Sequence, residues 1–310
     1  MTDLREVAVH LPPQRVAIAS LQDELGLTDA QLRAFERFFG LSHIRREPGG
    51  TGYDLMLAAA GKLSELHGQE DRVRYVIQAR SMPVATVYPR SDVHEVRRAL
   101  GLRRAEAFTI VHQVCASGLL AVDLAGRLLA ADADPDALAL ILTGEKTFTT
   151  MARTVPGAAV NGEGAAALLV GVGGGHDRVL GYATRTYGRF NSGYVLPDEV
   201  NADFQQVYPN AVADVLTTAV DRAGISLDDV ALILPHNVNR VSWVRVCRLM
   251  GFPLERVLLD NVPETGHCFC ADSFINLRTA QELGRLRPGD RYVMAAVGLG
   301  GFFSAMVFEH

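Results

Sequence analysis

The residues that could carry nucleophilic chemistry, Cys115, His236 and His267, each stand between an expected strand and an expected helix. Cys115 follows the apolar run 107–111 and precedes three small residues and an apolar helical segment. A thiol at the start of a helix meets unpaired backbone N–H groups and the positive end of the helix dipole, and both favour the thiolate. Position alone leaves two interpretations of Cys115 open: a reactive nucleophile or a buried structural cysteine.

The two histidines occupy positions where α/β proteins build their sites. His236 lies just past the expected strand 230–234, and Asn239 is placed to cap the helix that follows. His267 lies five residues before Asp272, with which the next helix begins. Each histidine could instead be a loop residue with satisfied hydrogen bonds, and Asn239 could be a cap and nothing more.

Cys268 and Cys270 beside His267 raise the possibility of a metal site. Zinc sites normally combine C-x₂₋₄-C spacing with a second pair of ligands, which this segment lacks, so we expect no metal and no cofactor. The glycines of 298–306 (GLGGFFSAM) mark a tight backbone between two strands. Their exposed N–H groups could help to form an oxyanion hole, or the segment could be a simple tight turn.

The elements that must position these residues alternate along the chain. Near-continuous apolar strands alternating with amphipathic helices predict an α/β fold with sheets covered on both faces. We expect strands at 73–80, 107–112, 137–143, 165–172, 230–234, 257–260, 291–297 and 303–308, and helices at 54–66, 91–100, 116–131, 207–223, 240–250 and 271–283.

The pattern repeats with a period of roughly 155 residues, estimated by matching similar segments of the chain. The segment around Cys115 matches the segment around His267 in shape, which would place the two loops face to face at a pseudo-twofold axis. The Gly-rich stretch 171–176 is a natural boundary between the repeats. We therefore predict two related halves, 1–174 and 175–310, that form one compact unit.

Composition excludes several classes of protein. The chain has 310 residues, 48% of them hydrophobic, and a net charge of −5, which does not suit a nucleic-acid binder. No stretch of about 18 uncharged apolar residues indicates a membrane span, and no signal peptide is evident. Four cysteines do not make a disulfide framework, so we expect a cytoplasmic protein with reduced thiols.

Five segments resemble the thiolase superfamily, and ketoacyl-ACP synthase III most closely. GLSHIRREPG is similar to that family's Gly-Ile-Arg-x-Arg segment, HQVCASG to its nucleophile loop, and NGEGAAALLV to its Gly-Asp-Gly-Ala segment. PHNVN fits its Pro-His-x-x-Asn, and GLGGFFSAMVF fits its C-terminal Gly-rich strand. Five matches in the right order, over nearly the whole chain, are specific for the fold.

The resemblance implies a five-layered αβαβα fold of two related halves, usually assembled as a homodimer. It also implies that Cys115 accepts the acyl group, that His236 is the family's histidine, and that the N–H groups of Cys115 and Leu299 hold the thioester oxyanion. The substrate pocket would be lined by Asn239, by Phe302 and, from the partner subunit, by Tyr88.

One departure from the family concerns the chemistry. Synthase III enzymes have Gly-Asn where this chain has Gly266-His267. A histidine can both donate a hydrogen bond and take a proton, and Asp272 could orient it and raise its basicity. The change therefore favours a base able to deprotonate an acceptor hydroxyl or amine.

A second departure concerns the acyl donor. Ala34 and Phe38 stand where coenzyme A-using relatives have a Trp and an Arg, which favours an acyl carrier protein as donor over free coenzyme A. Carrier proteins are acidic and need basic contacts. Arg240, Arg245 and Arg248 on the helix after His236 are the candidates, unless they form only a solvated helix face.

Three functions follow as hypotheses. The first is an acyltransferase of natural-product metabolism that passes an acyl group from Cys115 to a hydroxyl or amine of a small-molecule acceptor. The second is decarboxylative condensation with a malonyl thioester, in which His236 and His267 would donate to the thioester oxygen. The third is a non-catalytic relative that binds an acyl carrier.

Overall fold

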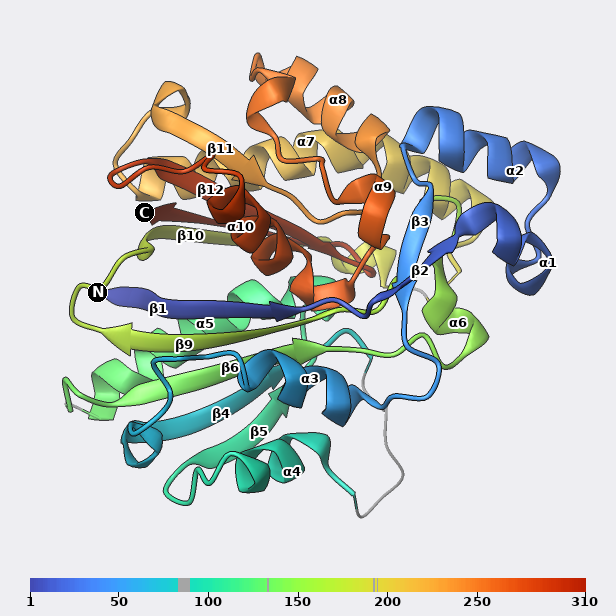
Figure 1. Ribbon diagram of the computed structural model, residues 1–310. Helices are drawn as coiled ribbons and strands as arrows, with labels where there is room; N and C mark the ends of the chain where they lie inside the picture. Colours follow the sequence, from blue (N-terminus) through green and yellow to red (C-terminus); the bar gives the residue numbers. More distant parts are fainter. Residues whose placement is uncertain (83–89, 133, 192, 194) are drawn as a thin grey trace.

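The computed structural model describes residues 1–82, 90–132, 134–191, 193 and 195–310. A mixed sheet of nine strands runs through the molecule in the order β11-β12-β13-β10-β1-β9-β6-β4-β5 (Figure 1). The strands are β1 (Thr2–His10), β4 (Val73–Ala79), β5 (Glu106–Ile110), β6 (Leu138–Gly144), β9 (Ala165–Val172), β10 (Arg178–Thr186), β11 (Val230–Leu234), β12 (Arg291–Gly298) and β13 (Phe302–Glu309).

The strand order confirms the internal repeat. The first half is ordered β1-β9-β6-β4-β5 and the second β10-β13-β12-β11, so that each strand of the second half has a counterpart at the same place in the first. The first strands of the two halves, β1 and β10, pair antiparallel where Asp3 lies opposite Arg178. Because this pairing joins the halves into one sheet, the two halves form one continuous structure, and the boundary near residue 174 stays a prediction.

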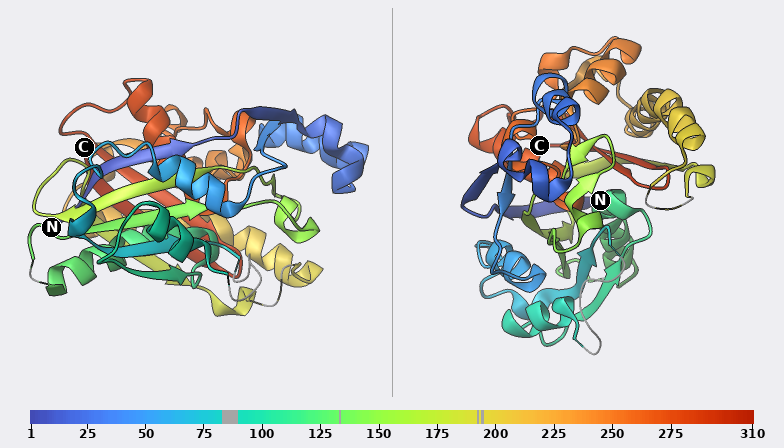
Figure 2. Two further views of the ribbon diagram at one scale, coloured as in Figure 1. Left: turned by 60° about the horizontal axis from the view of Figure 1, so that its bottom comes forward. Right: turned by 90° about the vertical axis from the view of Figure 1, so that its right-hand side faces the viewer.

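The helices form layers on both sides of the sheet (Figure 2). The main ones are α3 (Gly52–Ala60), α4 (Asp92–Ala99), α5 (Ser117–Asp132), α7 (Asp198–Arg222), α8 (Arg240–Met250) and α10 (Asp272–Glu282). Apolar side chains of α5 and α10 share one core with strands of both halves, whereas α3 and α4 cover the first half and α7 and α8 the second. The molecule therefore has the expected layered α/β architecture with α5 and α10 at its centre.

The segment Val114–Asp132, which includes α5, is long and apolar enough to cross a membrane by composition alone. More than half of its residues are buried in the protein, among them Leu119, Val122 and Leu129. Its apolar character is explained by its place in the central layer, where apolar side chains from both halves surround it.

Most element predictions are confirmed. The strands 165–172 and 230–234 and the helix 240–250 have the predicted bounds. Other bounds differ: α3 ends at Ala60 instead of residue 66, and α7 begins at Asp198 instead of residue 207. Ser91 precedes α4 as predicted, but its side chain makes no capping hydrogen bond.

The predicted strand 257–260 is wrong. Only Val257 forms a bridge, to Ile233 of β11, so this segment is the residual counterpart of β5. β1 and β10 were missing from the predicted elements, because polar residues interrupt their apolar pattern.

Candidate active site

Two short turns of the same sequence pattern face the centre of the molecule. His112-Gln-Val-Cys115-Ala precedes α5, and His267-Cys-Phe-Cys270-Ala precedes α10, at an offset of 155 residues. Both contain a 3₁₀ turn, Val114–Ala116 and Phe269–Ala271. The residues before the two cysteines, Val114 and Phe269, have positive φ angles of 51° and 54°.

The same hydrogen bond closes both turns. The Gln113 N–H donates to Ser117 Oγ over 3.1 Å, and the Cys268 N–H donates to Asp272 Oδ1 over 2.7 Å. Positive φ is costly for a β-branched or aromatic residue and marks a turn held by its surroundings. Cys115 and Cys270 are therefore counterparts in the repeat, and so are Ser117 and Asp272.

Cys115 is buried at the start of α5, as the sequence predicts. Its Sγ lies 3.3 Å from His267 Nε2 and accepts a hydrogen bond from Ser81 Oγ over 3.2 Å. Gly298 at the end of β12 allows the turn to pack closely, since a Cβ at that position would lie 2.1 Å from the Gln113 carbonyl oxygen. The thiol is thus held between a histidine and a hydroxyl donor.

His267 connects Cys115 to Asp272. Its Nδ1 lies 2.5 Å from Asp272 Oδ2, and the same carboxyl oxygen accepts the Asn237 N–H over 2.6 Å. Burial alone would lower the pKa of His267, but the Asp272 carboxylate and the Cys115 thiolate, through charge and hydrogen bonds, raise it to about 10. A protonated His267 is therefore favoured at neutral pH, and it lies 3.3 Å from Cys115 Sγ.

His236 has a different environment. It is buried at the end of β11, and its Nε2 lies 2.8 Å from the hydroxyl oxygen of Tyr208 on α7. Burial, together with the nearby charge of His267, lowers the pKa of His236 to about 4. The imidazole is therefore neutral near pH 7, and burial raises the pKa of Tyr208, so that its hydroxyl stays protonated. These two groups form a neutral dyad beside the Cys115–His267–Asp272 triad.

Two cavities meet at Cys115, His267 and Leu299. The first, of about 300 Å³, has many polar side chains and runs toward α7 and α8. The second, of about 400 Å³, is mostly apolar. The first is lined by Asn201, Gln205, Tyr208, His236, Asn239, Ser242 and Arg245, and the second by Met82, Met151, Val155 and Phe269, among others. We call the first the polar cavity because of these side chains, although most of its wall is apolar, and the second the apolar cavity. A thiol where the two meet suits a substrate with a polar arm and an apolar acyl group.

The other predicted site residues are distributed as follows. Asn239 caps α8, its Oδ1 accepting the Ser242 N–H over 2.8 Å, and it also lines the polar cavity. Leu299 lies in the turn between β12 and β13 and borders both cavities. Phe302 begins β13 and does not appear among the described residues lining either cavity, so its predicted pocket role has no support here. Tyr88 lies outside the described residues.

The predicted docking arginines share the exposed side of α8. Arg240, Arg245 and Arg248 are all exposed, and Arg245 also borders the polar cavity. Within the described part of the chain, none of the three has an ion-pair partner. Their positive charge is therefore directed to solvent near one cavity mouth.

Sequence reasoning missed Ser81, Tyr208 and Glu145. Ser81 follows β4 as His236 follows β11, at the repeat offset, so the internal repeat could have identified it. Glu145, buried at the end of β6, accepts the N–H groups of Ser81 and Met82 over 2.6 and 3.0 Å, and burial raises its pKa. Tyr208 has no sequence signal, because only the packing of α7 brings it to His236.

The cysteines beside His267 make other contacts. Cys268 Sγ faces the Thr265 carbonyl at 3.8 Å, and Cys270 Sγ donates to the Val114 carbonyl over 3.2 Å. Burial raises the pKa of both thiols. Among the described residues, no group of three or more His, Cys, Asp or Glu side chains is arranged so that it could hold a metal ion.

The chain is similar to known proteins over its whole length. The family model of the 3-oxoacyl-acyl-carrier-protein (ACP) synthase III C terminal matches residues 220–310. The β-ketoacyl-acyl-carrier-protein synthase III of Paracoccus denitrificans is 30% identical, with 97% of each chain covered. That of Rhizorhabdus wittichii is also 30% identical, with 82% of each chain covered.

Solved structures share the fold. Synthase III from Aquifex aeolicus superposes with a TM-score of 0.85 at 21% identity, covering 100% of both chains. ChlB3, an acyltransferase, superposes with a TM-score of 0.86 at 20% identity, covering 99% of this chain and 97% of its own. With the two repeats, the central cysteine turn and relatives at 30% identity over almost the entire length, this chain belongs to the β-ketoacyl-acyl-carrier-protein synthase III family of the thiolase superfamily.

Proposed function

We propose that the protein is an acyltransferase that carries an acyl group as a thioester on Cys115 and passes it to a hydroxyl or amine. The observation that carries the proposal is the continuous chain of contacts from Cys115 Sγ through His267 to Asp272, at 3.3 and 2.5 Å. A nucleophile, a base and a carboxylate that orients the base make up an acyl-transfer triad.

In the first step, the Cys115 thiolate attacks the carbonyl carbon of a donor thioester. The donor's sulfur leaves with the bonding electrons and takes the proton held by His267. Cys115 then carries the acyl group and His267 is neutral. Ser81, which hydrogen-bonds the sulfur in the free protein, helps to hold the thiolate in position for this attack.

In the second step, the acceptor attacks the acyl group on Cys115. Acylation removes the negative charge on sulfur, one of the two charges that raise the pKa of His267, so the neutral imidazole persists long enough to act as a base. It takes the proton from the acceptor hydroxyl or amine as the new bond forms, and Cys115 leaves as thiolate. General-base assistance of this kind typically contributes about 10²–10⁴-fold in rate.

His236 serves this chemistry as a neutral hydrogen-bonding group. Its Nε2 faces Tyr208 and it lines the polar cavity, where the incoming acceptor would lie. A neutral imidazole and a protonated phenol can orient a polar acceptor without competing with His267 for the proton. Because His267 takes the proton and His236 only orients the acceptor, the two histidines together favour transfer of the acyl group to oxygen or nitrogen.

The proposed donor is an acyl carrier protein. The polar cavity gives a carrier's prosthetic arm a route to Cys115, and its mouth lies beside the exposed Arg245 on α8. Arg240 and Arg248 extend the positive surface along the same helix. An acidic carrier would find complementary charge there. The apolar cavity would then hold the acyl group.

Decarboxylative condensation is the second candidate, favoured by the names of the bacterial relatives. In that reaction both histidines would donate to the oxygen of a malonyl thioester. The contact of His236 with Tyr208 and the Asp272 carboxylate, which orients His267 to act as a base once Cys115 is acylated, favour the first candidate. A non-catalytic role as an acyl-carrier-binding protein is the third.

Intact-protein mass spectrometry separates the three. The protein is incubated with acyl-carrier and acyl-coenzyme A thioesters, malonyl included, beside Cys115→Ala. We expect a mass gain that depends on Cys115 and that hydroxyl or amine acceptors discharge. Discharge by malonyl carrier with release of CO₂ would support condensation instead, and no adduct from any donor would support the binding protein.

A further inference from the structure

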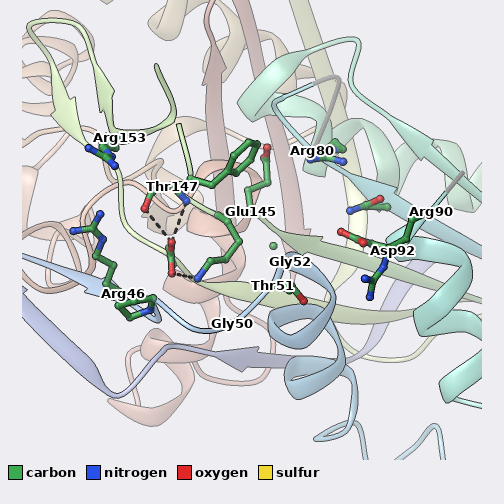
Figure 3. Close-up of a pocket in the computed structure, with 16 residues that line it drawn as sticks. Arg46, Gly50, Thr51, Gly52, Arg80, Arg90, Asp92, Glu145, Thr147 and Arg153 are labelled. Carbon is green, nitrogen blue, oxygen red and sulfur yellow. Dashed lines mark hydrogen bonds and ion pairs between the residues drawn. The ribbon is translucent and has the colours of Figure 1, made fainter. Parts of the chain in front are cut away.

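A cavity of about 560 Å³ lies apart from the nucleophile. Cys115 does not line it, and it is larger than either cavity at Cys115. Its walls come from β3 (His43–Arg46), the loop before α3, the end of β4, the start of α4 and the segment after β6. Figure 3 shows Arg80 and Asp92 on one side of this cavity, Arg46 and Arg153 on the other, and Glu145 between them.

Several charged groups of this cavity already have partners. Lys146 forms an ion pair with Glu163 at 2.5 Å, and the Glu163 carboxylate also accepts hydrogen bonds from Thr147. Arg46 and Arg153 both pair with Glu24, at 2.6 and 3.3 Å. These groups shape the cavity and make its left side in Figure 3 positive. Because they are paired within the protein, they need no ligand to offset the loss of hydration.

Arg80 and Asp92 differ from the rest. Each is only 7% exposed. Arg80 lies near the carboxyl groups of Asp92 and Glu145, and Asp92 near the charges of Arg80 and Arg90. Among the described residues, the buried Arg80 Nε has no hydrogen-bond partner. Both line the cavity. A guanidinium and a carboxylate that have lost most of their hydration need partners to offset that loss. The mutual charges of Arg80, Asp92 and Glu145 offset part of that loss, and the Arg80 Nε that lacks a hydrogen-bond partner in the described part of the chain is placed to meet a bound molecule.

The surrounding backbone favours an anion near Arg80. Helix α3 begins at Gly52 and α4 at Asp92, and the first residues of both helices line the cavity. Helix N-termini carry partial positive charge, which attracts anions, although at α3 a capping box of Thr51 and Asp54 already satisfies part of the first turn. The carboxylates of Asp92 and Glu145 in the same walls oppose a doubly charged phosphate, so a single carboxylate suits the site better.

We propose that this cavity binds a small molecule with a carboxylate for Arg80 and, a few atoms away, an ammonium or hydroxyl group for Asp92, as in amino acids and hydroxy acids. The site is separate from the acyl-transfer centre and does not depend on the function proposed for Cys115. Asp92 would accept the hydrogen bond that the ligand's ammonium or hydroxyl donates, and Arg80 would donate to its carboxylate.

The test is ligand-induced thermal stabilisation and calorimetry on the full chain. The probes are the twenty common amino acids, lactate and glycerate, with propionate and propylamine as molecules that carry only one of the two groups. Arg80→Gln and Asp92→Asn remove the two contacts. Arg72→Gln, which removes an exposed arginine that pairs with Asp136, is the matched control. Cys115→Ala separates this site from the acyl site.

We expect at least one two-group probe to bind, and each cavity variant to weaken it by about tenfold or more. Propionate and propylamine should bind far more weakly, while Arg72→Gln and Cys115→Ala should bind as the parent does. Comparing the binding of amino acids with that of hydroxy acids will show whether Asp92 contacts an ammonium or a hydroxyl group. The circular dichroism of Arg80→Gln and Asp92→Asn should be that of the parent, which shows that both variants fold.

Three results would overturn the proposal. One is the absence of binding by every probe. Another is binding that persists in both Arg80→Gln and Asp92→Asn while the circular dichroism of each variant is that of the parent. The last is a change of oligomeric state in Arg80→Gln with no change in binding, which would assign the cavity to contacts between copies of the chain.

Discussion

At the scale of single residues, the site is defined by the 2.5 Å contact between His267 Nδ1 and Asp272 Oδ2. Asp272→Asn keeps the shape and still accepts the Cys268 N–H, but its amide no longer offers a charged acceptor to His267. The pKa of His267 should fall, because the carboxylate that raises it is gone. We expect transfer to slow by about 10²–10⁴-fold.

The measurement is the steady-state rate together with the pH dependence of Cys115 alkylation by iodoacetamide. His236→Gln is the comparison, since His236 does not contact Cys115 through any described hydrogen bond. An Asp272→Asn protein that turns over at the parental rate would show that the triad does not operate. If His236→Gln is the more damaging variant, the roles of the two histidines are reversed.

Ser81 is the second residue-scale prediction. Its hydroxyl donates to Cys115 Sγ, and a hydrogen bond to a charged acceptor is worth about 1.5–3 kcal/mol. Ser81→Ala should therefore slow alkylation of Cys115 at neutral pH by roughly tenfold or more. Ser81→Thr keeps the hydroxyl and should restore most of the reactivity. An alanine variant that is alkylated at the parental rate would reduce Ser81 to a packing residue.

His236 gives a prediction about acid stability. Its pKa is about 4 in the folded protein and 6.5 in the unfolded chain, so as pH falls from 6.5 to 4 the unfolded state takes up a proton that the folded state does not. The free energy of unfolding should drop by roughly 3 kcal/mol over that window because of this residue alone. His236→Gln should lose that part of the dependence. Urea unfolding of the parent and of His236→Gln at pH 7 and pH 4.5 tests this prediction. An equal loss of unfolding free energy in the two proteins between these pH values would contradict it.

At the scale of elements, Gly298 shows how strand β12 fixes the turn that carries Cys115. A Cβ there would lie 2.1 Å from the Gln113 carbonyl oxygen, and backbone cannot rotate away as a side chain can. Gly298→Ala should destabilise the protein by about 3 kcal/mol or more and impair Cys115 alkylation. Gly49→Ala, where no atom lies within 4 Å of the added methyl group, should stay within about 0.5 kcal/mol. Equal melting temperatures for the two variants would contradict this account.

The elements also show what the sequence could predict. Strands such as β9 and β11 were found because they are buried on both faces and read as unbroken apolar runs. β1 was missed because half of its residues are polar, although it joins the two halves through β10. The apolar pattern of a short segment indicates how buried a strand is. It does not indicate which strands pair across the middle of the sheet, because that depends on residues far apart in the chain.

The residues of the candidate site likewise divide into those that the sequence predicted and those that it did not. Cys115, His267 and Asp272 were predicted because each stands at a strand-to-helix turn with recognisable chemistry, and the structure brings them into contact. Tyr208, the partner of His236, was not predicted because it reaches the histidine only through tertiary packing. Ser81, the partner of Cys115, was also missed, although its place in the internal repeat could have identified it. The fifth strand of the second half was predicted from an apolar run that forms only one bridge.

At the scale of the whole molecule, the sheet ends at β5, which pairs with β4 on one side only. An unpaired edge strand offers a row of free backbone groups and is normally covered or paired. The side chains of Phe148, which lines the 560 Å³ cavity, and Met151, which lines the apolar cavity, add apolar surface on the first half, each about half exposed. Because a monomer would leave both features in water, we predict that two copies associate into a homodimer.

The dimer prediction has a direct test in light scattering coupled to size exclusion. The expected mass is twice the 33.6 kDa of one chain, held over a hundredfold dilution. Hydrogen exchange at the amides of β5 should be slow in the dimer, since a strand edge in solvent would exchange rapidly. Met151→Glu should weaken the association if the exposed apolar surface lies in the interface. A monomer with fast-exchanging β5 amides would show that the edge is open and that both cavities at Cys115 are completed by one chain alone.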